Sequence, residues 1–230
     1  RASCQAMAWC CCCTEETLAD VKFEATGEDN IASLHRQLAP ADIGKDMEFT
    51  VTIIRTSADT PLGVFIDVAD GRYVRVCEIR PGNSPVQAYN TEAYAKGLPR
   101  IMVGDFIMKV NSVNSSSVAL GEEIRQSTKL DLTIRRPLYF EVWLCNDEKG
   151  HLGLDLNYAT KGASLVIDKI TPGSAENYNK ADPDNAIKRH DHIVAVDDFE
   201  GTAAEILAKL GSSASPGKIV KLMISRPWGL

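Results

Sequence analysis

Short runs in which apolar and polar residues alternate occupy most of the chain after residue 48. Alternation at every second position is the pattern of a β-strand with one buried face. Glycine and proline residues separate the runs and indicate turns. The predicted strands are 49–55, 64–68, 73–79, 106–111 and 130–134 in the first half, and 140–145, 154–156, 165–170, 192–197 and 219–224 in the second.

One segment of the second half has helical spacing instead. Residues 202–210 place Ile206, Leu207 and Leu210 at intervals that predict a helix with one apolar face. The same place in the first half, after the strand at 106–111, also predicts a helix. Each half therefore combines short strands with one or two helices, which indicates an α+β or mostly β class.

The two halves repeat one another at an interval of about ninety residues, as three pairs of motifs show. Leu62-Gly63-Val64 recurs as Leu152-Gly153-Leu154 and Arg136-Pro137 as Arg226-Pro227, each after 90 positions, and Pro81-Gly82 recurs as Pro172-Gly173 after 91. Because the matches keep their order, they predict two domains in tandem with almost no linker. The predicted boundaries are an extension at 1–46, partly flexible or packed on a partner, domains at 47–137 and 138–227, and a tail at 228–230.

The repeated motifs resemble those of the PDZ family over roughly residues 47–227. The family's Gly-Leu-Gly-Phe loop, its Pro-Gly turn before a short helix and its Gly-Asp-x-Ile-x-x-Val-Asn strand each have two counterparts here. These are Pro61-Leu62-Gly63-Val64 and His151-Leu152-Gly153-Leu154, then residues 81–85 and 172–175, then 104–111 and, less faithfully, 189–197. The resemblance implies two small, partly open β-barrels or sandwiches, each with one or two helices.

In the PDZ family the glycine loop holds the carboxylate of a partner's last residue, and the resemblance implies the same role here. Glycine leaves room for backbone N–H groups to converge on an anion, and the next strand offers its unpaired edge to the peptide. Pro61 stands where the family prefers glycine and lacks an N–H, which favours the second domain. The implied carboxylate loops are Leu62, Gly63, Val64 and Leu152, Gly153, Leu154, with Phe65, Ile66 and Leu156 on the receiving edges.

Many family members have a histidine at the first residue of the helix that lines the groove, and it selects Ser or Thr in the peptide. Our alignment places Ser117 or Val118 there in the first domain, and Thr202 or Ala203 in the second. The resemblance then implies a peptide with apolar side chains at its last and third-last positions. Trp228-Gly229-Leu230 is itself such an end, so self-association is one hypothesis and a packed or disordered tail is the other.

Composition excludes some classes of protein. The 230 residues carry a formal net charge of −6 at pH 7, which argues against a general nucleic-acid binder. No apolar run approaches the roughly 20 residues of a membrane-spanning helix. Most of the seven cysteines lie in the first thirteen residues, which is no disulfide framework and favours an intracellular reducing compartment. Cys10, Cys11, Cys12 and Cys13 follow Met7 closely and are candidates for S-acylation and membrane contact.

The sequence contains no phosphate-binding loop and no dinucleotide fingerprint. His190-x-His192 has a spacing compatible with a metal, yet no third ligand is in evident reach, so we interpret the pair as polar residues at the start of a strand. We expect no enzyme activity, no cofactor and no metal. Two hypotheses remain: an adaptor at a membrane surface that binds carboxyl-terminal peptides, and an accessory subunit of a larger complex. The cytoplasmic face and the plastid stroma both stay open, the latter if Arg1 follows a cleaved transit peptide.

Overall fold

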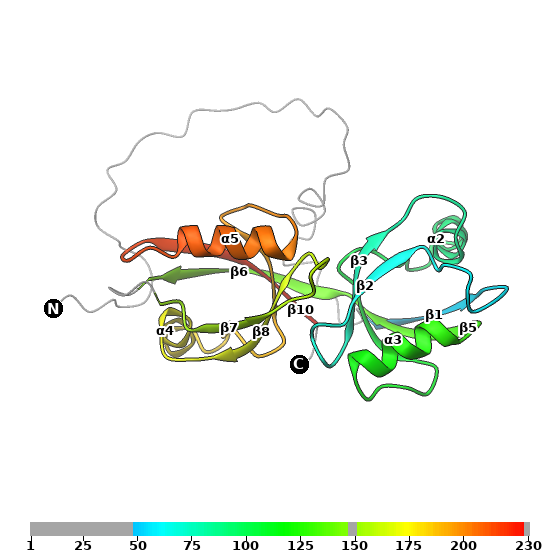
Figure 1. Cartoon of the computed structure of the whole chain (residues 1–230), viewed down its shortest axis with the longest axis horizontal. Coiled ribbons are helices and arrows are strands. Elements are labelled where there is room, and N and C mark those ends of the chain that lie inside the picture. Colours follow the sequence, from blue (N-terminus) through cyan, green and yellow to red (C-terminus); the bar gives the residue numbers. More distant parts are fainter. Residues whose placement is uncertain (1–47, 147–150, 228–230) are drawn as a thin grey trace, which may run out of the picture.

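The computed structural model describes residues 48–146 and 151–227, which form two domains side by side along the long axis of the molecule (Figure 1). Within these ranges each domain has one antiparallel sheet and two helices. The first contains β1 (Glu48–Ile54), β2 (Val64–Asp67), β3 (Val74–Ile79), α2 (Pro85–Ala95), β4 (Phe106–Val110), α3 (Ser117–Gln126) and β5 (Lys129–Arg135). The second contains β6 (Pro137–Cys145), β7 (Leu154–Asn157), β8 (Leu165–Ile170), α4 (Ser174–Ala181), β9 (His192–Val196), α5 (Ala203–Ser213) and β10 (Ile219–Pro227).

The two sheets have the same strand order. It is β1-β5-β4-β3-β2 in the first domain and β6-β10-β9-β8-β7 in the second. Neither sheet closes into a barrel, so β2 and β7 are edge strands whose outer backbone groups can accept another strand. The predicted fold class, two small open β-rich domains with helices in tandem, is confirmed.

Each domain has its own apolar core, closed on one side by a helix. Leu120 and Ile124 of α3 are at most 6% exposed, and Ile206 and Leu210 of α5 are at most 4% exposed. Both pairs are four residues apart, so they lie on one face of the helix and pack against the sheet. The two helices are therefore equivalent parts of the repeat, and their registers can be compared position by position.

A buried ion pair accounts for two of the repeated motifs. In the first domain Arg136 Nε lies 3.1 Å from Asp105 Oδ1. In the second Arg226 donates to both oxygens of Asp191 at 2.6 Å. Each pair joins the loop before the fourth strand of its domain to the end of the last strand, and both carboxylates are only 1% exposed. The Gly-Asp and Arg-Pro motifs therefore hold the fold together rather than a ligand.

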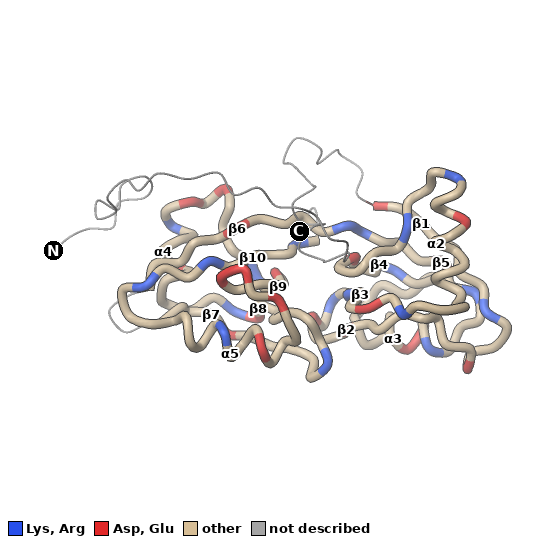
Figure 2. Tube along the Cα trace, turned by 90° about the horizontal axis from the view of Figure 1, so that it is seen from above, with Lys and Arg blue, Asp and Glu red and all other residues tan. Residues whose placement is uncertain are grey.

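The two sheets follow each other almost without a linker. Pro137 begins β6 and pairs with Pro227 in the second sheet, so Arg136 alone separates β5 from β6. The predicted extension at 1–46, its cysteines at 10–13 and the tail at 228–230 lie outside the described residues. Within the described part of the chain, no helix has both the length and the apolar character needed to cross a membrane. Acidic and basic residues are interspersed over both domains (Figure 2).

Candidate functional site

The glycine loop of the second domain turns three successive backbone N–H groups in one direction. The carbonyls of His151, Leu152 and Gly153 accept hydrogen bonds from Ser174, Ala175 and Thr171, at 3.1, 2.9 and 2.9 Å. In a trans peptide unit the N–H points opposite to the C=O. The N–H groups that follow these carbonyls, those of Leu152, Gly153 and Leu154, therefore point away from that turn. The N–H groups of Leu152 and Gly153 donate to no other described residue.

Gly153 is required in this loop for two reasons. Its φ of +73° lies in the left-handed region that favours glycine. A Cβ atom at this position would also lie 2.5 Å from the carbonyl oxygen of Thr171 and about 3 Å from the backbone of Gly173. The loop can thus approach the Pro172-Gly173 turn closely only because both residues lack a side chain.

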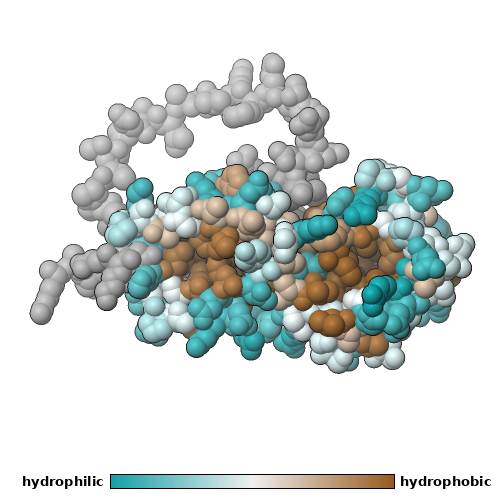
Figure 3. All heavy atoms as spheres, in the orientation of Figure 1, coloured by the Kyte–Doolittle hydropathy of each residue, from teal (hydrophilic) through white to brown (hydrophobic). Residues whose placement is uncertain are grey.

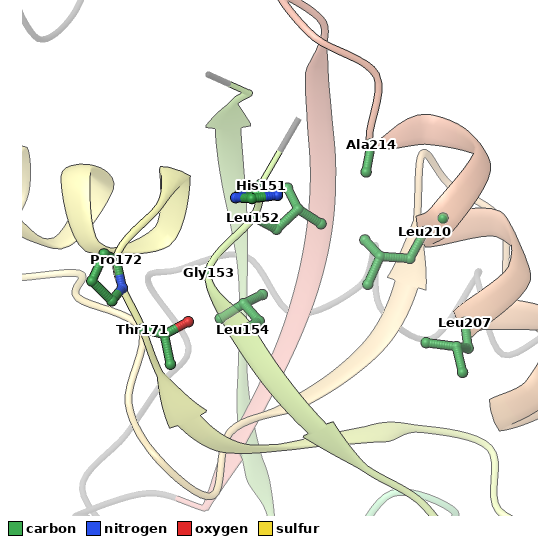
Figure 4. Close-up of a pocket in the computed structure, with 10 residues that line it drawn as sticks. His151, Leu152, Gly153, Leu154, Thr171, Pro172, Leu207, Leu210 and Ala214 are labelled. Atoms are coloured by element: carbon green, nitrogen blue, oxygen red, sulfur yellow. The ribbon is translucent and has the colours of Figure 1, made fainter. Parts of the chain in front are cut away.

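A pocket of about 350 Å³ opens beside this loop, between β7 and α5 (Figure 4). Leu152 and Leu154 form one wall, and Leu207 and Leu210 face them from the helix. Most of the wall is therefore apolar, while the N–H groups of the loop lie at the end of the pocket. The remaining lining residues are His151, Gly153, Thr171, Pro172, Gly211 and Ala214.

Strand β7 continues from the loop as the free edge of the sheet. Leu154 and Leu156 are half-buried against the core, while Asp155 and Asn157 between and after them are exposed. The pairing with β8 shifts between Asp155 and Leu156, and β2 has the same irregularity between Phe65 and Ile66. The receiving edges predicted from the sequence, Phe65, Ile66 and Leu156, are thus on edge strands of matching geometry.

The first domain has the same loop but a different helix. Gly63 has a φ of +82°, and the carbonyls of Leu62 and Gly63 accept from Val86 and Arg80, at 3.2 and 2.8 Å. Two N–H groups, those of Gly63 and Val64, are turned in this way, against three in the second domain. Gly121 of α3 stands where α5 has Leu207, so the helix wall of this groove has no side chain at that position.

The loop after β2 lies directly on α3. Ser117 Oγ donates to the carbonyl of Val68 at 2.7 Å, and Val68 Cγ1 lies 3.3 Å from where a Cβ of Gly121 would be. The Val68 side chain therefore lies beside the helix position that has no side chain of its own. Apolar side chains gather in the first groove, and they form the right-hand brown patch in Figure 3.

The residues chosen from the sequence for the helix of each groove lie at the start of α3 and α5. Val118 is 69% exposed, and Ser117 beside it is the buried first residue of α3. Thr202 caps α5 and binds Glu205, while Ala203 is fully buried. In the second domain neither Thr202 nor Ala203 lines the pocket described above; the helix residues that line it are Leu207, Leu210 and Gly211, with Ala214 after them. The helical spacing of the sequence could have indicated this wall, because positions 203, 207, 210 and 214 share one helix face.

His190 and His192 do not form a metal site but meet the first domain. His190 Nδ1 lies 2.8 Å from Asp70 Oδ1, and His192 Nε2 lies 3.3 Å from Asp70 Oδ2. His192 is fully buried, and burial lowers its pKa, with the hydrogen bond to Asp70 acting in the opposite direction. Among the residues that the structure describes, no three His, Cys, Asp or Glu side chains are grouped to hold a metal ion.

No family model and no curated protein matches this chain. Two solved structures of the INAD PDZ45 tandem are similar to it. One is in complex with an NG2 peptide, with 17% identity, coverage of 82% of this chain and 94% of that chain, and a TM-score of 0.35. The other is in complex with NORPA CC-PBM, with 18% identity, coverage of 81% and 94%, and a TM-score of 0.35.

Proposed function

We propose that this protein is a non-catalytic adaptor whose second domain binds the carboxyl-terminal residues of partner proteins. The observation that carries the proposal is the junction of two features: an apolar pocket of about 350 Å³ and a loop with three N–H groups turned away from the fold. The N–H groups suit an anion, and the apolar pocket beside them suits an apolar side chain. A carboxyl terminus that ends in an apolar residue offers both.

The peptide would add to β7 as an antiparallel strand. Its carboxylate accepts from the N–H groups of Leu152, Gly153 and Leu154, and its earlier residues lie alongside β7 toward Asn157. The side chain of its last residue enters the space between Leu154, Leu207 and Leu210. Main-chain hydrogen bonds supply affinity for any sequence, while the pocket supplies the preference for an apolar end.

The helix gives the third-last residue no polar partner. Ala203 holds the first position of α5 and has only a methyl group, and the hydroxyl of Thr202 is engaged with Glu205 at 2.8 Å. A Ser or Thr in the peptide would lose a hydrogen bond to water without gaining one here. An apolar side chain at the third-last position is therefore preferred, as the sequence also implies.

The test uses a fluorescent peptide that ends in an apolar residue and carries another at the third-last position. We expect saturable binding by fluorescence anisotropy, with at least a tenfold loss when the carboxylate is replaced by an amide. Leu207→Lys should reduce binding by a similar factor, because it puts a charge in the apolar wall. Ala208→Lys, an exposed neighbour on the same helix, is the matched control and should bind normally.

Equal binding of the acid and the amide would contradict carboxylate recognition. Complete lack of binding, combined with native circular dichroism spectra, would instead favour the accessory-subunit hypothesis, in which the domains serve as packing surface. Attachment to a membrane through Cys10–Cys13 remains a separate proposal, tested by metabolic labelling with a fatty-acid analogue and by replacing the four cysteines with serine.

A further inference from the structure

The two domains touch through residues that occupy the same place in each repeat. Phe106 is the first residue of β4 and pairs with Arg75 and Arg135, while His192 is the first residue of β9 and pairs with Val166 and Ser225. The two rings contact each other edge to face, with centroids 5.0 Å apart. When equivalent residues of two repeats meet in this way, they lie on a local two-fold axis.

The ends of the two edge strands confirm this symmetry. Asp67 ends β2 and Asn157 ends β7. Asn157 Nδ2 donates to the carbonyl of Ala69 in the loop after β2, at 3.0 Å. In return, Asp67 Oδ2 lies 2.6 Å from where a Cβ of Gly162 would be, in the loop after β7. Each edge strand therefore ends against the loop that follows the other edge strand, which is the reciprocal pattern of a two-fold contact.

The orientation of the domains is held by buried polar contacts as well as by the short connection through Arg136. Asp70 of the first domain faces both His190 and His192 of the second, and its carboxylate is 1% exposed. Burying these polar groups without hydrogen-bond partners would cost free energy. Separating or rotating the domains while the groups stay buried is therefore unfavourable. The relative direction of the two grooves is thereby fixed by the fold.

The two grooves point in opposite directions. Both glycine loops stand at the beginning of their edge strand, and both strands end at the contact between the domains. In Figure 1, α5 lies above β7 in the left-hand domain and α3 lies below β2 in the right-hand one, as a half-turn about the viewing direction requires. The apolar patches of both grooves are visible on the same face of the molecule (Figure 3).

Peptides bound in both grooves would thus have their carboxylates at the outer ends of the molecule and their upstream residues at its centre. A four-residue edge strand spans about 13 Å. Since Asp67 and Asn157 both reach the contact between the domains, the upstream ends of the two peptides would be separated by roughly 10 to 15 Å.

We propose that the natural partner is a two-fold symmetric dimer with two identical carboxyl-terminal tails, and that one copy of this protein binds both tails. This proposal rests on the proposed function. Two tails that leave a dimer near its axis and diverge in opposite directions match the two grooves, whereas two tails that continue side by side along the axis do not. The first groove, with fewer N–H groups turned outward and a glycine at position 121 of its helix, contributes through effective concentration more than through its own affinity.

The test compares one peptide as a monomer and as a dimer linked by a disulfide. The linking cysteine is placed six or ten residues before the carboxyl terminus, so that two spans are sampled. We expect the dimer to bind about 100-fold tighter than the monomer. Light scattering should show one dimer bound to one copy of this protein.

Gly121→Lys places a long side chain in the first groove at a helical position with ordinary φ. It should remove most of the gain from dimerisation while leaving the affinity for the monomer unchanged. Gln126→Lys, exposed on another side of α3, adds the same charge and should keep the gain.

Different failures separate the two proposals. If the monomer binds but neither dimer binds more tightly, or if each dimer collects two copies of this protein, the symmetric-partner proposal is wrong and the proposed function stands. If the monomer does not bind at all, the proposed function itself fails. The stoichiometry is measured on the unaltered protein, so a variant that folds poorly does not affect this decision.

Discussion

Gly153 shows how a single residue can serve both the fold and the site. The same backbone geometry that lets the loop approach Gly173 also turns the N–H groups of Leu152 to Leu154 away from the Pro172-Gly173 turn. Neither role depends on a side chain. A substitution here therefore affects stability and binding together, and only a comparison with another left-handed glycine separates the two causes.

Gly153→Ala is expected to destabilise the protein by about 2 to 4 kcal/mol, because it adds a steric clash with Thr171 to the cost of a left-handed alanine. Gly97→Ala is the control, since Gly97 has a φ of +65° with nothing within 4 Å of the added Cβ. It should cost only about 1 kcal/mol. Urea unfolding of the two variants gives the difference. Equal losses would mean that the close approach at Gly153 has no energetic consequence.

At the scale of elements, the sequence predicted the strands well because each domain has an open sheet with one buried face. In β10, Val220, Leu222 and Ile224 alternate toward the core, as a period of two requires. The sequence predicted Thr202 or Ala203 as the first residue of the helix beside the second groove, and the structure shows that Thr202 is the cap and Ala203 the first helical residue. The pocket next to the glycine loop is lined further along the helix, from Leu207 onward, and the repeat alone does not show where along a helix such a pocket lies.

The buried ion pair occurs once in each domain, and the two copies differ in their distances and in the exposure of the arginine. Arg226 makes two short hydrogen bonds to Asp191 and is 10% exposed, whereas Arg136 is 25% exposed and its contacts to Asp105 are 3.1 and 3.4 Å. Burial raises the pKa of Asp105, against the opposing effect of Arg136. The second pair thus holds its carboxylate more tightly.

Asp191→Ala should destabilise the protein by about 3 to 5 kcal/mol, because it leaves the guanidinium of Arg226 buried without its partner. Asp105→Ala should cost less, since solvent can reach Arg136 in its place. Denaturant unfolding followed by circular dichroism measures both. A larger loss for Asp105→Ala than for Asp191→Ala would contradict this ranking.

At the scale of the whole molecule, the sequence could not predict the contact between the domains. The repeat fixed two similar units, but nothing in the pattern of residues linked Asp70 to His192, which lies more than a hundred positions away. His190-x-His192 was interpreted as a polar strand start, although His192 is fully buried against Phe106. Surfaces formed when two finished units meet depend on shape in three dimensions, which periodicity does not encode.

This contact should make the stability of the tandem depend on pH. Groups that face His192 are Asp70, Asp67 and Arg75 of the first domain, with His190 next to it. Because burial lowers the pKa of His192, the folded protein keeps it neutral at a pH at which the unfolded chain, with a pKa near 6.5, already takes up a proton. The unfolded state then binds more protons, so stability is full above about pH 6.5 and falls below it.

His192→Gln should therefore reduce the loss of stability between pH 7.5 and pH 5.5, as measured by urea unfolding at both values. Titratable groups away from this contact are common to both proteins, so their contribution cancels in the comparison. If His192→Gln loses as much stability on acidification as the unaltered protein, protonation of His192 does not oppose the contact, and Asp70 stabilises the charged ring as well as the neutral one.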